Sequence, residues 1–127
     1  MQNVGDGMND NYDLKKRTKA FALRVINLCE ALPNTMTASV IAKQLVRCGT
    51  SVGANYRAAC HARSQADFVA KLGIVREECD ESIYWMELLI ESGLMTEKRL
   101  QPLMEEANEQ LSIVISSIKT ARRKKST

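Results

Sequence analysis

A row of polar residues with helical spacing lies in the middle of the chain, within residues 44–68. Arg47, Ser51 and Asn55 are four residues apart, so they share one side of a helix beside its apolar row. Two interpretations stay open. The row fixes how helices or subunits meet, with Arg47 pairing with Glu81, or it contacts a ligand or a nucleic acid. Catalysis is the least supported reading of these residues.

The remaining reactive groups do not form a catalytic or metal-binding pattern. Four carboxylates cluster in one helical segment, but consecutive residues point around a helix and do not converge: Glu77, Glu78, Asp80 and Glu81. Di-iron bundles need Glu-x-x-His pairs, and the single histidine is His61. A glycine-rich phosphate loop and an HExxH motif are both missing. We therefore expect no enzyme activity, no cofactor, no metal and no small-molecule substrate.

The four cysteines lack the spacing of a metal site or a redox motif. Cys29, Cys48, Cys60 and Cys79 form no CxxC pair, and each falls in an apolar helical stretch. We expect buried, reduced thiols that pack as small apolar side chains. A zinc site would require ligands spaced more closely.

Composition indicates one all-helical domain. The 127 residues include two prolines, six glycines and 5% aromatic residues. No run approaches the ~18 apolar residues of a membrane span, and the N-terminus lacks the features of a signal peptide. We expect a cytoplasmic protein without a membrane partner. The net charge of +3 is too small to indicate nucleic-acid binding by itself.

Apolar residues in steps of three and four predict four helices within residues 12–121. We predict an unstructured tail for residues 1–11 and a solvated basic tail for residues 122–127. Pro33 ends the first helix, Thr35 or Thr37 caps the second, and Ser64 caps the third. The predicted apolar rows are Leu14, Thr18, Phe21, Val25, Leu28 and Leu32; Ile41, Leu45, Cys48, Val52, Asn55 and Ala59; Phe68, Leu72, Val75, Cys79, Ser82 or Ile83, Met86 and Ile90; and Leu100, Met104, Ala107, Leu111, Val114, Ile118 and Ala121.

Long helices with short connections predict an antiparallel up-down-up-down bundle. Gly93 ends the third helix and Thr96 caps the fourth. Glycine is unfavourable in a helix interior compared with alanine. We attribute the presence of Gly49 and Gly53 in the second helix to close approach by another helix, and the alternative is a break in the second helix.

An apolar stripe on the third predicted helix lies away from its core row. Ile74, Trp85 and Leu88 form this stripe, and exposed apolar stripes often mark partner surfaces. We predict that it is the interface of a homo-oligomer. The alternative is that these residues broaden the core face.

The order and spacing of several motifs resemble one protein family over about residues 12–121. Gln44-x2-Arg47-x3-Ser51-x3-Asn55 is followed by Arg63-Ser64-x3-Phe68-x3-Leu72-x-Ile74 and by Glu81. This pattern is similar to the four-helix-bundle proteins related to the 23S rRNA intervening-sequence protein.

The resemblance implies an antiparallel four-helix bundle that assembles as a cylinder-like homopentamer. A distant branch, the accessory protein of diversity-generating retroelements, works with a reverse transcriptase and nucleic acid. Gln44, Arg47, Ser51, Asn55, Arg63 and Glu81 carry over as family-motif residues involved in assembly. The chain departs from the family at residues 56–59, which read Tyr-Arg-Ala-Ala instead of Ile-Ala-Glu-Gly, and at residues 77–78, which read Glu-Glu instead of Gly-Ser. Roles resting on those family residues do not carry over.

Basic residues are unevenly distributed along the chain. Residues 35–66 contain four of them and no acidic residue. In an up-down-up-down bundle, the starts of the first and third helices meet the ends of the second and fourth. The candidates for contacts with RNA or DNA phosphates at this end are Lys15, Lys16, Lys19, Arg63, Arg122, Arg123, Lys124 and Lys125. The alternative is that these charges suit helix ends and aid solubility.

Overall fold

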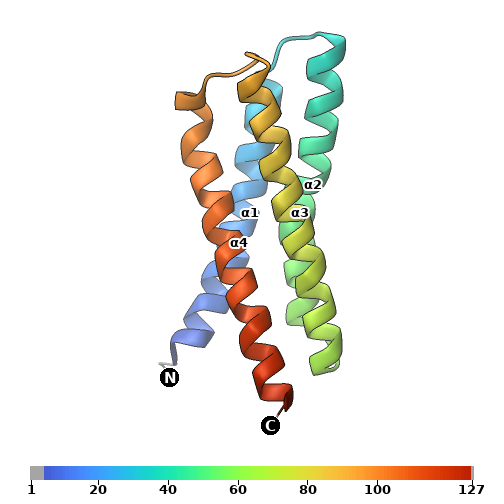
Figure 1. Cartoon of the computed structure of the whole chain (residues 1–127), viewed down its shortest axis with the longest axis vertical. Helices are drawn as coiled ribbons and strands as arrows, with labels where there is room; N and C mark the ends of the chain where they lie inside the picture. The colour runs from blue at the N-terminus through green and yellow to red at the C-terminus, as the bar shows by residue number, and fades with distance from the viewer. Residues whose placement is uncertain (1–4, 127) are drawn as a thin grey trace.

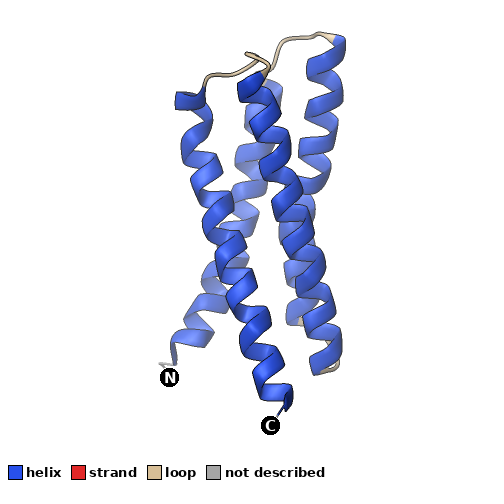
Figure 2. Cartoon of the chain, viewed as in Figure 1, coloured by secondary structure: helices blue, strands red, loops and turns tan. Residues whose placement is uncertain are grey.

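The computed structural model describes the backbone of residues 5–126 and the side chains of residues 14–124. Four helices make up this part of the chain: α1 (Gly5–Glu30), α2 (Met36–Cys60), α3 (Gln65–Glu91) and α4 (Glu97–Ser126). Short loops connect them, and residues 5–126 contain no strand (Figure 2). The predicted all-α, four-helix architecture is confirmed. No helix within residues 5–126 combines the length and apolar content needed to cross a membrane.

The helices run alternately up and down, and the termini lie at the same end of the bundle (Figure 1). Helix α1 packs on α2 and α4, and α3 packs on the same two helices. Helices α1 and α3 therefore occupy opposite corners of the bundle and run in the same direction.

Side-chain caps start three of the helices at the predicted positions. The hydroxyl of Thr35 accepts a hydrogen bond from the Ala38 amide at 3.2 Å, and that of Ser64 accepts one from Asp67 at 3.0 Å. Thr96 does the same for Arg99 at 3.2 Å. At the end of α3, Gly93 adopts a positive φ of 82°, a conformation that favours glycine over other residues.

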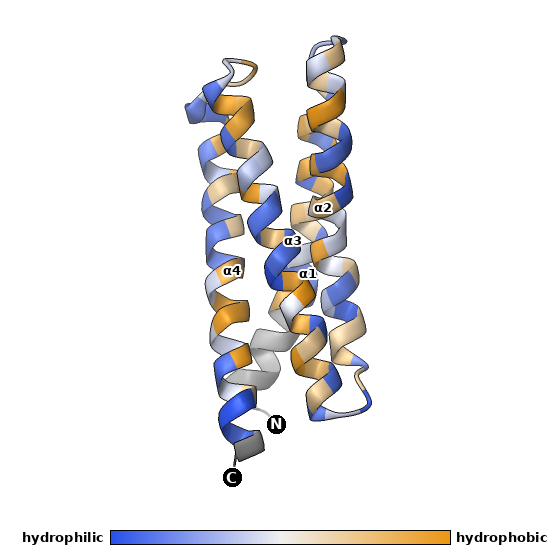
Figure 3. Cartoon of the chain, turned by 45° about the vertical axis from the view of Figure 1, so that its right-hand side comes forward, coloured by the Kyte–Doolittle hydropathy of each residue, from blue (hydrophilic) through white to orange (hydrophobic). Residues whose placement is uncertain are grey.

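The core is a continuous row of apolar residues along the bundle axis. Phe21, Val25, Leu45, Leu72 and Met86 are completely buried. Hydrophobic and hydrophilic residues alternate around each helix (Figure 3), as expected when each helix contributes one face to a shared core.

The predicted close approach at Gly49 and Gly53 is confirmed. A Cβ atom at Gly49 would lie 3.0 Å from both methyl groups of Val25, and one at Gly53 would lie 3.1 Å from the Thr18 hydroxyl. Helix α2 passes through both glycines without a break. Glycine is thus required here by the contact between α1 and α2.

The ends of the chain are more helical than predicted. Helix α1 begins at Gly5, whereas we predicted an unstructured tail for residues 1–11; residues 1–4 lie outside the described part. Helix α4 continues to Ser126, through most of the basic tail predicted for residues 122–127, and residue 127 is not described. Extending an existing helix adds one hydrogen bond for each residue fixed, so polar ends can continue it without apolar periodicity.

Four core positions differ from the predicted rows by one residue. Tyr56 is buried where Asn55 was predicted, and Leu89 is buried where Ile90 was predicted. Helix α4 buries Leu103 where Met104 was predicted and Gln110 where Leu111 was predicted. The four predicted residues are half-buried. A step of three and a step of four are both compatible with a helical period, so the sequence pattern did not distinguish these neighbours.

Candidate nucleic-acid interface and assembly surfaces

The starts of α1 and α3 meet the end of α4 at one end of the bundle, as the topology predicted. The side-chain amide of Gln65, the first residue of α3, donates a hydrogen bond to the backbone carbonyl of Ala121 on α4 at 2.9 Å. The loop that contains Arg63 lies at the same end (Figure 1). We call this end the basic pole, and define it by residues 14–20, 51–76 and 112–124.

The defined residues of the basic pole carry little negative charge. Among them, Asp67 alone carries a carboxylate. Asp6, Asp10 and Asp13 precede them in α1, and their side chains lie outside the described part of the chain. Asp67 is paired with Lys71 at 2.7 Å, and this hydrogen bond lowers its pKa. The end of α4 is strongly hydrophilic (Figure 3). Acidic residues lie instead toward the other end, where Glu30, Glu91 and Glu97 are exposed.

The predicted phosphate-binding residues are brought together at this pole. The side chain of Lys15 is half-buried. The others with described side chains are exposed: Lys16, Lys19, Arg63, Arg122, Arg123 and Lys124. The side chain of Lys125 lies outside the described part of the chain. The structure also adds cations that the sequence pattern did not single out, among them Arg57, Arg76 and Lys119.

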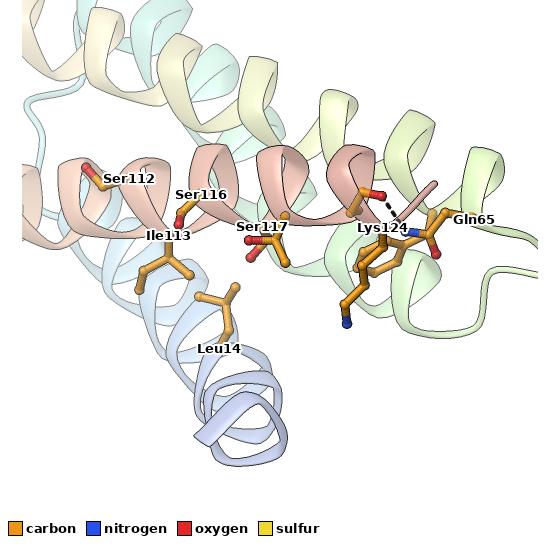
Figure 4. A pocket seen from close by; sticks show the side chains of 10 residues that line it. Leu14, Gln65, Ser112, Ile113, Ser116, Ser117 and Lys124 are labelled. Atoms are coloured by element: carbon orange, nitrogen blue, oxygen red, sulfur yellow. Dashed lines mark hydrogen bonds between the residues drawn. The ribbon is translucent and has the colours of Figure 1, made fainter. Parts of the chain in front are cut away.

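An open cavity of about 730 Å³ lies at the basic pole between α1, α3 and α4. Leu14 of α1 and Ile113 of α4 contribute apolar surface, and Ser112, Ser116, Ser117 and Thr120 line the α4 side with hydroxyl groups. In Figure 4, Lys124 stands at one end of this row beside Gln65. The cavity therefore offers hydroxyl donors and one cation next to the surface that carries the other cations.

The row of Arg47, Ser51 and Asn55 connects mainly to its own helix. The Ser51 hydroxyl donates to the Arg47 carbonyl at 2.7 Å, and the Asn55 amide donates to the Ser51 carbonyl at 2.9 Å. Arg47 alone of the three has described bonds that reach another helix. It donates to Glu78 at 3.2 Å and to Glu81, and also to Gln44 of its own helix at 3.1 Å.

The predicted pairing of Arg47 with Glu81 thus occurs across α2 and α3 of one chain. Glu81 also accepts a hydrogen bond from the indole of Trp85 at 3.1 Å. Because the Arg47 side chain is 47% exposed, this cluster lies in water-accessible surroundings. It links α2 to α3 and is of small energetic weight.

A second ionic cluster joins α1 to α4, and the sequence pattern did not reveal it. Arg17 contacts Glu106 through two parallel hydrogen bonds of 2.9 and 3.0 Å, and also contacts Glu109. Gln110, completely buried, donates to Glu106 at 2.7 Å and to the Arg17 carbonyl at 3.3 Å, while its own oxygen has no partner among the described residues. Burial by itself raises the pKa of Glu106, but the hydrogen bonds from Arg17 and Gln110 outweigh it and lower the pKa below its ordinary value.

The predicted interface stripe is partly exposed and partly packed against the core. Ile74 is 41% exposed, whereas Trp85 and Leu88 are half-buried and contact core residues. Tyr84 is 52% exposed and meets Trp85 edge-to-face, with ring centroids 5.2 Å apart. Further exposed apolar side chains lie on other helices, namely Leu23, Ile26, Met36 and Val40.

All four cysteines are free thiols, and Cys48 and Cys79 are buried. Burial raises the pKa of the Cys79 thiol to about 12 and that of Cys29 to about 11. Among the described residues, no group of three or more histidine, cysteine or acidic side chains could hold a metal ion.

Comparisons with known proteins agree with the motif resemblance. A family model described as 23S rRNA-intervening sequence protein matches residues 10–116. A crystal structure of a protein with unknown function, from the S23 ribosomal protein family of Bacteroides thetaiotaomicron, is 38% identical in sequence and superposes with a TM-score of 0.81. That similarity covers 86% of this chain and 97% of the other. No curated protein matches this chain.

Proposed function

The chain belongs to the 23S rRNA-intervening sequence protein family, and from this starting point we propose that it is a non-enzymatic, oligomeric binding protein. In this proposal it acts in the cytoplasm as an accessory or scaffold protein that contacts RNA or DNA phosphates through the basic pole. The oligomer is a homopentamer, as the family resemblance implies.

The observation that carries this proposal is the separation of charge along the bundle. Arg63 lies in the loop before α3, and Arg122 and Lys124 lie in α4, yet all three lie at the basic pole, whose defined residues hold a single carboxylate. A cationic surface of this kind attracts a polyanion, because each phosphate contact releases condensed counterions. The proposal concerns backbone contacts and not base recognition, since no exposed Phe, Tyr or Trp side chain lies among the described residues of the basic pole.

Assembly would strengthen such a weak contact. A single pole offers a few exposed lysines and arginines, whereas five copies in a ring would present the same cations five times along one nucleic acid. Linked binding sites raise the overall affinity because the later contacts form at high effective concentration. This connects the proposed oligomer to the proposed binding activity.

A second candidate is a structural or protein-interaction oligomer that binds no nucleic acid. The exposed apolar groups of Ile74, Tyr84 and Met36 favour it, because such groups mark protein contacts. In that case the cations at the end of α4 would stabilise the helix dipole and keep the protein soluble.

Salt-dependent binding separates the two candidates. We would measure the affinity for fluorescent duplex DNA and for single-stranded RNA between about 50 and 200 mM salt by anisotropy, where phosphate contacts have a large effect. The proposal expects affinity to fall steeply with salt. Removal of Arg122–Lys125 should weaken binding and reduce the slope of log K against log salt by about one for each lost contact.

A matched control uses cations at the opposite end of the bundle. Lys98 and Arg99 are exposed near the start of α4, and changing both to Gln should leave binding and its salt slope unchanged. Absence of binding at low salt would reject the nucleic-acid role. Equal losses of affinity from the deletion of Arg122–Lys125 and from the changes of Lys98 and Arg99 would show that only the net charge matters. That result would reject the basic pole as the binding site.

A further inference from the structure

We infer that copies of this protein contact one another through two different faces: the α1 face of one copy, defined by Lys19, Leu23 and Ile26, packs on the α3 face of the next, defined by Glu77, Asp80 and Tyr84. This inference deepens the self-association in the proposed function and rests on it. The occupant of each face is thus a second copy of this chain.

The α1 face is an apolar surface with a cation at its edge. Leu23 is 56% exposed and Ile26 is 37% exposed, and neither belongs to the core row of α1. Lys19, Leu23 and Ile26 are separated by four and three residues, so they form one stripe on the helix. Lys19 is exposed at the end of the stripe nearer the basic pole.

The α3 face has the opposite charge around an aromatic centre. Glu77, Asp80 and Tyr84 are all exposed and are separated by three and four residues, so they also form one stripe. Glu87 continues the acidic surface one turn further. Tyr84 is 52% exposed and is held in place by its edge-to-face contact with Trp85.

The two faces lie at the same level along the bundle. Val25 of α1 packs on Gly49 of α2. The adjacent Cys48 accepts a hydrogen bond from the Ser82 hydroxyl of α3 at 3.3 Å. The middle of α1 is therefore level with the middle of α3, and these two helices run in the same direction (Figure 1).

The two faces have the same residue spacing as well as opposite charges. Seven residues separate Lys19 from Ile26, and seven separate Glu77 from Tyr84, which is about 10.5 Å along a helix in each case. When two copies lie side by side with parallel axes, Lys19 comes level with Glu77, and Ile26 comes level with Tyr84. Opposite charges then meet at one end of the contact and apolar groups at the other, with Leu23 near the level of Asp80 between them.

The arrangement of the faces determines the type of assembly. Helices α1 and α3 occupy opposite corners of the bundle, so one copy can use its α1 face and its α3 face at the same time. Contacts between two unlike faces are heterologous and close into a ring or continue as a filament. Assembly of this kind occupies Lys19 at the edge of the basic pole and leaves Arg63 and the end of α4 open.

A charge exchange tests the predicted contact. We would compare wild type with Lys19→Glu, Glu77→Lys and the double variant by sedimentation velocity over a range of protein concentrations. Each single change places like charges at the contact and should weaken self-association at least tenfold. The double variant restores opposite charges with the positions exchanged, and should recover assembly to within about threefold of wild type, since complementary charges fix partner choice and register.

Lys98→Glu, which reverses an exposed cation away from both faces, is the matched control and should assemble as wild type does. Single changes without effect on an assembled wild type would overturn the two-face contact and leave the proposed oligomer intact. The same conclusion would follow if the double variant assembled no better than the single ones. A monomeric wild type at all concentrations would reject the oligomer itself, and the inferred contact with it.

Discussion

Val25 of α1 packs directly on the backbone of α2 at Gly49, where an added Cβ would lie 3.0 Å from both of its methyl groups. Neither side can easily yield, because the β carbon of Val25 would itself be 3.3 Å away. The contact thus sets the distance between two helices that together contribute much of the core. It explains why a glycine is present in a helix interior, where alanine would otherwise be favoured.

Gly49→Ala should therefore destabilise the protein by about 1–3 kcal/mol, because overpacking outweighs the gain in helix propensity. Gly73 provides a matched control in α3, since a Cβ there would meet nothing within 4 Å. Gly73→Ala should stabilise the protein by up to about 1 kcal/mol. Urea unfolding of both variants measures the difference. Equal stability of the two variants would contradict the close-contact explanation.

The ionic contact between Arg17 and Glu106 should make stability depend on pH. The folded pKa of Glu106 is lower than its ordinary value of 4.5, so its stabilising contribution is complete above that value. The contribution is lost as the pH falls through the folded pKa. Arg17→Met should lower the free energy of unfolding at pH 7 by about 1–2 kcal/mol, because a hydrogen-bonded pair is lost.

The difference between wild type and Arg17→Met should shrink as the pH falls below 4.5, because wild type also loses the charged pair there. Urea unfolding at neutral and acidic pH gives this comparison. Arg57→Met, which removes an exposed cation of α2, serves as the control and should show little effect at either pH. A difference that stays constant across pH would mean that Arg17 contributes through packing alone.

The sequence was sufficient to predict the bundle but not every contact within it. Caps at Ser64 and Thr96 use local hydrogen bonds, so their positions can be read from a few neighbouring residues. Core positions near Tyr56 and Gln110 depend on which of two adjacent residues faces inward, and packing against other helices decides this. Apolar periodicity says nothing about a polar residue such as Gln110.

Contacts between distant residues were the least predictable part of the candidate sites. The pairing of Arg47 with Glu81 was predicted as one interpretation of the polar row on the second helix. Arg17 with Glu106 was not predicted, because no local pattern relates residues separated by 89 positions. The basic pole followed from topology alone, since alternating helix direction determines which ends meet.

Cys79 should react with thiol reagents only when the protein unfolds. It is completely buried, its pKa is raised to about 12 by burial, and its thiol lies 3.2 Å from the Ala107 carbonyl. The thiolate is the reactive form, so both access and ionisation are unfavourable. Half-buried Cys60 should be alkylated by N-ethylmaleimide much earlier, as mass spectrometry of peptides would show. Labelling of Cys79 at the rate of Cys60 would indicate that the core opens readily.

Ile74 gives a cleaner test of the predicted stripe than Trp85 or Leu88. The latter two contact core residues, so replacing them with Ala would lower stability as well as remove surface. Ile74 is 41% exposed, and Ile74→Ser should change the free energy of unfolding by no more than about 0.5 kcal/mol.

If the stripe is an interface, Ile74→Ser should nevertheless shift the protein to smaller species in sedimentation velocity, because the contact loses apolar area. Met36→Ser, which changes an apolar side chain that is 82% exposed at the start of α2, is the comparison. Loss of assembly with Ile74→Ser but not with Met36→Ser would assign the interface to the stripe. Unchanged mass for Ile74→Ser would show that this residue lies outside the contact between copies.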